Sequence, residues 1–200
     1  METIRGKTSH AMDLTELHAR LASHKRLMLD LGTGDGKFAF CYAENFPSHF
    51  VIGVDSCREN LHEYSRAGLP NLLYVIANAQ SIPHELSGLF SHVTINFPWG
   101  SLLQGLLAGD SRLLCGLEST LGSGAQLEVR LNGGALSEAG CDLAKGTERV
   151  CQSLMHAGWN IYSQRIMDTA ILRKFPSTWA KRLAFGRDPH ALEIRAKFNA

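Results

Sequence analysis

The stretch LMLDLGTGDGKF, residues 27–38, decides the fold of this chain. Its first five residues are apolar apart from Asp30, which predicts a short buried strand. The glycines that follow let the backbone turn tightly and come close to a ligand before a helix begins near Lys37. A plain tight turn uses glycine for the same reasons, so the loop predicts a cofactor site without identifying the cofactor.

Two carboxylates narrow the choice of ligand. Asp30 lies at the end of the first strand, and Asp55 closes a second apolar strand, 51–54. A carboxylate about twenty residues beyond such a glycine loop is the usual partner of ribose hydroxyls. The pair therefore indicates an adenosine-bearing ligand, and both a nicotinamide cofactor and S-adenosylmethionine (SAM) fit that description.

Another strand, residues 92–95, is followed by Asn96-Phe97-Pro98-Trp99-Gly100. This sequence puts an amide, a rigid proline and a large flat ring at the carboxyl edge of a parallel sheet, where such sheets bind ligands. A dehydrogenase has no special use for the combination. A methyltransferase acting on a flat base does, because a ring stacked on Trp99 can be aligned with the methyl group of SAM.

Strands and helices alternate along the chain, which is typical of a doubly wound α/β domain with a mostly parallel sheet. A capping box at Asp13 and Glu16 opens a helix, and residues 4–12 form a small extension or hairpin. The final segment 192–198 alternates apolar residues with Glu193, Arg195 and Lys197, which predicts an antiparallel strand with one solvated face. The strands expected before it are 27–31, 51–55, 72–77, 93–96, 126–131 and 159–165. Helices are expected near 37–44, 58–66 and 143–156, with helical pieces between 102 and 121.

Length and composition indicate the number of domains, the absence of a membrane span and the state of the cysteines. We expect residues 1–200 to form a single domain, with residues 1–25 as an N-terminal extension and helix. No stretch approaches the roughly 18–20 uncharged apolar residues that span a bilayer. The five cysteines are odd in number and form no CxxC pair, which argues against a disulfide framework or a zinc site. We therefore expect a cytoplasmic monomer with no metal and no membrane contact.

The net charge is only +1, but its distribution is uneven. From Arg165 to the end of the chain there are eight Lys or Arg residues against three Asp or Glu residues. Such a segment is either a surface that faces a polyanion or a solvated helix face with basic residues.

Four segments carry a family resemblance: LDLGTGDG (29–36), VIGVD (51–55), INFPWGSLL (95–103) and FPSTWAKRLAFGR (175–187). The chain resembles the aminoglycoside-resistance 16S rRNA methyltransferases that modify N1 of adenine 1408 in the ribosomal decoding site. The first two segments are shared by many SAM enzymes, whereas the FPWG and SxWAKRL blocks together are narrow. The similarity runs over nearly the whole chain.

The resemblance implies a class I SAM-dependent methyltransferase fold that acts on 16S rRNA within the assembled 30S subunit. It implies that the target adenine is flipped out and held between Trp99 and Trp179, while we interpret Trp159 as a core residue. The implied contacts to SAM are Asp30, Gly32, Gly34, Asp35, Asp55, Ala79, Gln80, Phe97 and Ser101. The implied contacts to RNA are Pro98, Ser177, Lys181, Arg182 and Arg187.

The chemistry agrees with this picture. Adenine N1 carries a lone pair at neutral pH, so its attack on the methyl group of SAM needs no general base, metal or covalent intermediate. Alignment of the reactants can lower the barrier by about 7–11 kcal/mol. The sequence correspondingly offers no Ser/His/Asp or paired-carboxylate constellation.

Three alternatives stay open at this point. Asn96-Phe97-Pro98-Trp99 is similar to the Asn-Pro-Pro-aromatic loop of methyltransferases that grip an exocyclic amine, which would direct methylation to N6. The near-neutral charge also fits a methyltransferase of a small aromatic metabolite. A third possibility is a SAM-binding, ribosome-associated factor with little activity.

The sequence also departs from the family. Relatives carry a lysine cluster between the second helix and the third strand that docks on the 30S subunit, but residues 64–70 offer only Arg66. The segment from Asn132 is abbreviated, and Pro189 stands where another basic residue is expected.

Overall fold

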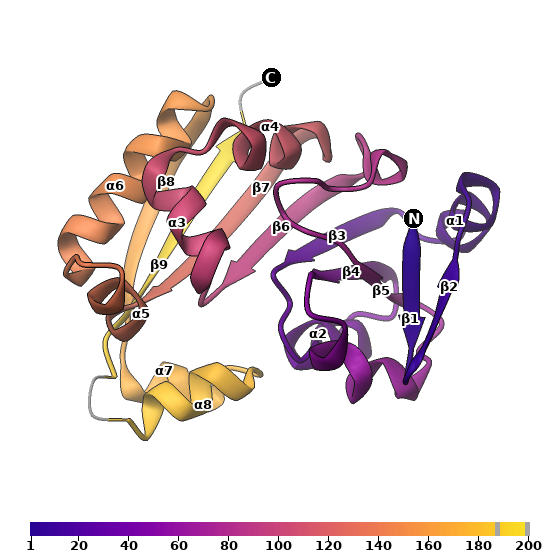
Figure 1. Ribbon diagram of the computed structural model, residues 1–200, viewed down its shortest axis with the longest axis horizontal. Helices are drawn as coiled ribbons and strands as arrows, with labels where there is room; N and C mark the ends of the chain where they lie inside the picture. Colours follow the sequence, from indigo (N-terminus) through magenta and orange to yellow (C-terminus); the bar gives the residue numbers. More distant parts are fainter. Residues whose placement is uncertain (187–188, 199–200) are drawn as a thin grey trace.

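Nine strands form one sheet in the computed structural model, which describes residues 1–186 and 189–198 (Figure 1). The strand order across the sheet is β2-β1-β5-β4-β3-β6-β7-β9-β8. The strands are β1 (Glu2–Arg5), β2 (Thr8–Ala11), β3 (Arg26–Leu31), β4 (His49–Asp55), β5 (Leu72–Ile76), β6 (Phe90–Asn96), β7 (Leu121–Asn132), β8 (Trp159–Met167) and β9 (Ala191–Phe198).

The five central strands, β5-β4-β3-β6-β7, are parallel to one another. From β3 the chain moves outward through β4 to β5 and then returns to the other side of β3 as β6, so the strand order reverses between β3 and β6. β9 inserts antiparallel between β7 and β8, and the β1–β2 hairpin pairs antiparallel with β5 at the opposite edge. The expected α/β fold, a mostly parallel sheet with an antiparallel C-terminal strand, is confirmed, and residues 1–11 form the hairpin.

Helices cover both faces of the sheet at β3, β4 and β5, because the apolar side chains of these strands alternate between two cores. In β4, Phe50, Ile52 and Val54 face a large core shared with α1, α3, α4, α5 and α6, whereas Val51 faces a smaller core shared with α2. The helices are α1 (Leu14–Leu21), α2 (Lys37–Asn45), α3 (Gly100–Ala108), α4 (Ser111–Ser119), α5 (Gly133–Glu138), α6 (Leu143–His156), α7 (Thr169–Lys174) and α8 (Thr178–Ala184), with short 3-10 turns at Arg58–His62, Tyr64–Ala67 and His84–Leu86.

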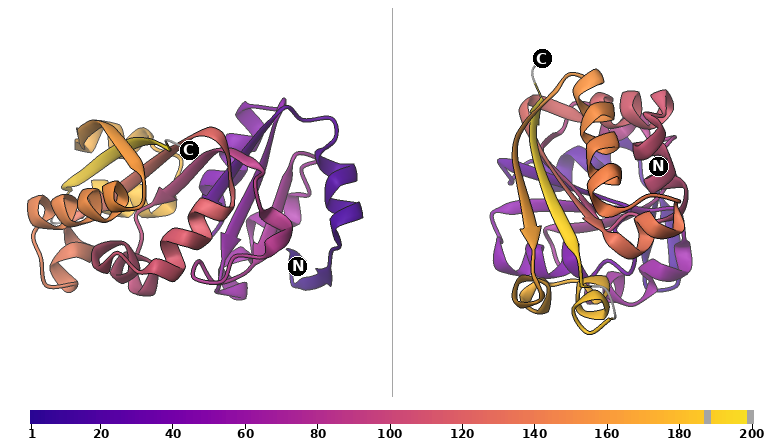
Figure 2. Two further views of the ribbon diagram at one scale, coloured as in Figure 1. Left: turned by 90° about the horizontal axis from the view of Figure 1, so that it is seen from above. Right: turned by 90° about the vertical axis from the view of Figure 1, so that its left-hand side faces the viewer.

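The short helices α7 and α8 lie beyond one end of the sheet, where the views from the front and from the side agree (Figures 1 and 2). A third apolar cluster, which includes Met167, Leu172 and Ala180, fixes them to Phe97 at the end of β6. Sequence reasoning did not predict these helices. The signals were the N-cap Asp168, whose carboxylate accepts from the Ile171 N–H at 2.8 Å, and Pro176, which separates the two helices.

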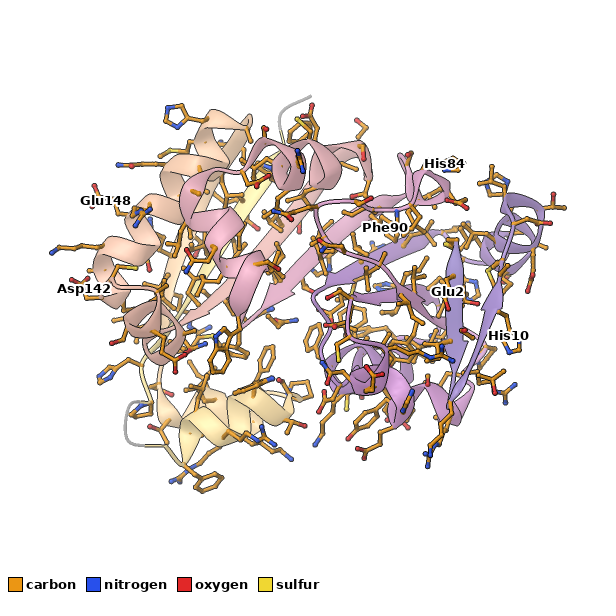
Figure 3. All side chains as sticks on the ribbon, viewed as in Figure 1. Glu2, His10, His84, Phe90, Asp142 and Glu148 are labelled. Carbon is orange, nitrogen blue, oxygen red and sulfur yellow. The ribbon has the colours of Figure 1, made fainter. Side chains whose placement is uncertain are left out.

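The side chains divide into those that fill the layers and those that reach solvent (Figure 3). Glu2 and His10 mark the hairpin edge, and Asp142 and Glu148 mark α6 at the opposite side of the molecule. Asp142 caps α6 by accepting from the Lys145 N–H at 2.8 Å. In the residues described, no helix is long and apolar enough to cross a bilayer.

Two local expectations were wrong. Residues 58–66 form two 3-10 turns rather than one α-helix, because neither turn has a side-chain cap and only Leu61 and Ser65 are buried. Glu193 does not face solvent, since it is 7% exposed and pairs with Arg130 on β7. Trp159 lies in the core, as we interpreted it.

Gly36, which precedes α2, gives a test of this packing. Its φ is +81°, and a Cβ atom there would lie 2.6 Å from the ring of Tyr74, whose hydroxyl donates to the Gly36 carbonyl at 2.7 Å. Gly36→Ala should lower the free energy of unfolding by about 1–2 kcal/mol for the left-handed backbone and about 1–3 kcal/mol more for the overlap. Urea denaturation measures the sum.

Gly140→Ala is the matched control, because Gly140 has φ +82° and open space where a Cβ would lie. It should show the backbone cost alone. Equal losses in the two variants would contradict the close packing of Tyr74 against the glycine loop.

Candidate active site

A cleft of about 250 Å³ opens at the carboxyl ends of β3, β4 and β6, where the strand order reverses. Open parallel sheets bind ligands at this position. The floor of the cleft is the glycine loop that follows β3, and the segment after β6 and the start of α8 form the wall. The predicted site residues that line it are Asp30, Gly32, Gly34, Asp35, Asp55, Ala79, Phe97, Pro98, Trp99, Ser101, Ser177 and Trp179.

Asp55 fixes the backbone of the glycine loop by hydrogen bonding. One carboxylate oxygen of Asp55 accepts from the Gly34 N–H at 2.8 Å, and the other accepts from the Cys57 N–H at 2.8 Å. Gly34 has φ +60°, and an added Cβ would meet no atom within 4 Å. A ligand can therefore approach the backbone at Gly34 more closely than any side chain would allow.

Asp30 lies beneath the loop and is only 1% exposed. Its carboxylate accepts hydrogen bonds from the Thr33 hydroxyl at 2.5 Å, the Thr94 hydroxyl at 2.7 Å and the Asn96 amide at 2.9 Å. Burial raises the pKa of Asp30, although these three donors act in the opposite direction. The site thus holds a carboxylate whose negative charge is poorly solvated, so a cationic group of a ligand stabilises it.

Asn96 connects Asp30 to a second buried group that sequence reasoning missed. Its amide nitrogen donates to Asp30, and its amide oxygen accepts from Nη1 of Arg130 at 2.8 Å. Arg130 is 5% exposed and also binds Glu193. No motif marked Arg130 in the sequence. The only signal was an arginine inside a strand that was otherwise expected to be buried.

Trp99 and Trp179, eighty residues apart in the chain, meet at the rim of the cleft. Their ring centroids are 5.6 Å apart with an angle of 70° between the planes, and the side chains are 51% and 39% exposed. The guanidinium of Arg182 lies 5.2 Å from the Trp179 ring centroid. Exposed indole rings in mutual contact at a cleft are available for stacking on a flat ligand.

Three other predicted residues lie away from the cleft lining, and one lies outside the described residues. The Gln80 amide donates to Asp110, the N-cap of α4, at 3.0 Å, so a contact between Gln80 and a cofactor stays a prediction. Lys181 and Arg182 are exposed on α8 beside the rim. Arg187 falls in the gap at 187–188.

Comparison with known proteins agrees with this site. The chain matches the NpmA family model, described as 16S rRNA (adenine(1408)-N(1))-methyltransferase, over residues 2–198. It is 31% identical over 205 residues to the Escherichia coli 16S rRNA (adenine(1408)-N(1))-methyltransferase, covering 94% of each chain.

Two solved structures extend the match. The 16S rRNA methyltransferase KamB superposes with a TM-score of 0.89 at 28% identity, covering 100% of both chains. A mutant of the 16S rRNA (adenine(1408)-N(1))-methyltransferase from Catenulisporales acidiphilia, solved with the cosubstrate SAM, gives 0.87 at 27% identity and covers 100% of this chain and 97% of that one. The chain therefore belongs to the 16S rRNA (adenine(1408)-N(1))-methyltransferase family, and its methyl donor is SAM.

Proposed function

We propose that this protein transfers the methyl group of SAM to N1 of adenine 1408 in the 16S rRNA of the assembled 30S subunit and thereby gives aminoglycoside resistance. The observation that carries the proposal is the contact of Trp99 and Trp179 at the rim of the cleft, next to the glycine loop. Membership of the family identifies the substrate, and the paired indoles provide stacking surfaces for a flipped base.

The cleft offers a set of contacts that fits SAM. We assign Asp30 to the methionine end, where its carboxylate can attract the ammonium group, and Asp55 to the ribose hydroxyls. The backbone at Gly32 and Gly34 gives the close approach. SAM supplies an electrophilic methyl group on a sulfonium, and the remaining cleft residues orient it: Asp35, Ala79, Phe97 and Ser101.

The two indoles must separate before a base can enter between them. Stacking on both faces of a flat base requires about 7 Å between the two rings, because each contact spans about 3.5–4.0 Å. The observed centroid distance is 5.6 Å with the rings edge to face. We propose that stacking of the base, at roughly 1–3 kcal/mol for each indole, replaces the contact between the two rings and offsets the few kcal/mol that base flipping costs.

The hydrogen bonds of Asn96 favour N1 over N6 as the target. A side chain that grips an exocyclic amine offers it an amide oxygen, but one of the two lone pairs of the Asn96 oxygen already accepts from Arg130, and the Asn96 nitrogen donates to Asp30. Methylation at N1 needs no such acceptor. The N1 lone pair forms the new N–C bond, the S–C electron pair stays on sulfur, and the base becomes a cation, so the protein has to align the reactants and move no proton.

Docking on the 30S subunit has a candidate surface beside the hairpin. The Arg5 guanidinium lies against Gly68, the Arg66 side chain lies against Gly6, and the Arg58 guanidinium donates to the Lys7 carbonyl at 2.9 Å. All four cationic side chains are exposed. We propose that they replace the lysine cluster of the relatives, with Lys181, Arg182 and Arg187 contacting RNA nearer the cleft.

Arg5→Glu should then raise the KM for 30S subunits and leave the affinity for SAM unchanged, whereas an unchanged KM would exclude this surface.

We further propose that residues 1–200 act as one domain and as a monomer in the cytoplasm. Light scattering of the protein alone would show one copy, and a dimer would contradict the proposal.

Primer extension across the decoding site tests the proposed reaction. After incubation of 30S subunits with the protein and SAM, reverse transcription should stop at adenine 1408. Trp99→Ala and Trp179→Ala should each lower the yield about tenfold or more, because each removes one stacking face, while the affinity for SAM stays within a few-fold of wild type.

The outcomes of these experiments distinguish the proposed reaction from a metabolite methyltransferase and from a structural role of the two tryptophans. An unmodified site at saturating protein would reject the reaction. Methylation of a small aromatic compound with no dependence on salt would favour the metabolite alternative, since binding to rRNA weakens steeply with ionic strength. An equal loss of SAM binding in the tryptophan variants would make the two residues structural.

Asp30→Asn tests the cofactor assignment. The variant keeps the shape of the side chain but removes the charge, and SAM affinity should fall about tenfold to a hundredfold, the range expected for hydrogen bonds to a charged group. Because burial raises the pKa of Asp30, wild-type affinity should also decline as the pH falls through that raised pKa. Calorimetry of SAM binding at several pH values measures both effects.

Stability provides the control. A carboxyl whose folded-state pKa is raised stabilises the fold below its unfolded pKa and loses that contribution as the pH rises through the folded pKa. At neutral pH the ionised Asp30 therefore costs stability, and Asp30→Asn should unfold no earlier than wild type. Unchanged SAM affinity in a folded variant would contradict the assignment.

A further inference from the structure

A buried cation lies behind the cleft, at a place the proposed reaction does not itself use. Arg130, near the end of β7, is 5% exposed and has three polar partners on three strands. Nη1 donates to Asn96 on β6, Nε donates to Glu193 on β9 at 3.0 Å, and Nη2 donates to Glu128 on β7. A buried charge is stable only with such compensation.

The same guanidinium lies over the ring of Phe175, just before the helix α8 that carries Trp179. Its central carbon is 4.8 Å from the ring centroid of Phe175, which ends α7. The Phe175 ring stacks on Phe38 of α2 with an interplanar angle of 3°, and its edge meets Phe97 at 5.6 Å. Phe175 thus joins Arg130 to both α2 and the segment after β6.

Phe175 is directly linked to the base-binding rim. Its carbonyl accepts from the Ser177 N–H at 2.8 Å, and Ser177 is the N-cap of α8, which carries Trp179 two residues later. On the other side, Phe97 precedes Pro98 and Trp99, and its N–H donates to the Arg130 carbonyl at 2.7 Å. Phe97 has φ +51°, so its backbone is held in a conformation that an L residue adopts only under constraint.

We propose that Arg130 is a positioning residue for methyl transfer. One buried guanidinium fixes Asn96 against Asp30 in the cofactor half of the cleft, and through Phe175 it fixes the start of α8 and so Trp179 in the base half. Arg130 touches neither reactant. It sets the distance between the two halves, on which the alignment of methyl and base depends. The inference rests on the proposed function for its activity readout only.

An arginine is required for this role because the two contacts use different parts of the side chain. The N–H groups of the guanidinium donate to Asn96 and the carboxylates, while its central carbon lies over the Phe175 ring. Lysine keeps the charge but has neither the planar fork nor the stacking face. Arg130→Lys therefore separates charge from geometry.

Phe175→Leu removes the aromatic face and leaves the polar contacts in place. Arg195→Lys is the matched control, since Arg195 also binds Glu193, at 2.8 Å. Arg195 is half-exposed and, within the part of the chain that the structure describes, makes no hydrogen bond to Asn96 and no cation–π contact with Phe175. Trp159→Phe gives a background in which the only indoles are Trp99 and Trp179, because the chain has three tryptophans.

In that background, near-ultraviolet circular dichroism reports the contact between the two indoles without any substrate. Arg130→Lys and Phe175→Leu should each lose most of this signal, and kcat on 30S subunits should fall about tenfold to a hundredfold. SAM affinity should drop a few-fold in Arg130→Lys, which loosens Asn96, and stay unchanged in Phe175→Leu. Arg195→Lys should match wild type in all three measurements.

A merely structural role would lower the melting temperature of the variants without changing kcat or the indole signal of the folded protein. That result, or an equal loss in Arg195→Lys, would overturn the proposal. If Arg130→Lys does not fold, Phe175→Leu decides, and a wild-type indole signal and kcat there would likewise overturn it. Inactive wild-type protein would reject the proposed function, while the circular dichroism still tests the positioning role.

Discussion

The geometry of the active site depends above all on the hydrogen bonds around the buried Asp30 carboxylate. Asp30 lies one residue before the end of β3, the central strand at which the order of the sheet reverses, and its donors come from the glycine loop and from β6. The same carboxylate thus ties the two sides of the switch point together. Without ligand the charge is short of solvation, which makes the site selective for a partner that brings a positive group.

From Asp30 the polar contacts run outward through Asn96 and Arg130 to the last strand of the sheet and to Phe175. This path explains why an antiparallel β9 matters to a site formed by parallel strands. β9 places Glu193 directly opposite Arg130, and the pairing compensates the buried charge of Arg130. Helices α7 and α8 then pack at this end of the sheet, and α8 carries Trp179. The position of the residues that face the base therefore depends on the residues that form the cofactor site.

The sequence predicted the parts of the fold that follow local pattern. The glycine loop, the alternation of strands and helices and the period-two pattern of the last strand each have a short-range cause. The paired indoles came from the family resemblance. The helices α7 and α8 were missed because each is under eight residues, with too few apolar positions for a recognisable period. Arg130 and Glu193 were missed because their burial follows from the register of β7 against β9, and the alternating pattern alone put Glu193 on the solvated face.

The most direct test of this account is a structure of the protein bound to the 30S subunit with a SAM analogue. The account predicts that adenine 1408 leaves its stack and lies between the rings of Trp99 and Trp179, with N1 facing the methyl position and the indoles separated from their present contact. A base that stays stacked in its helix, or one that presents its exocyclic amine to Asn96, would contradict it.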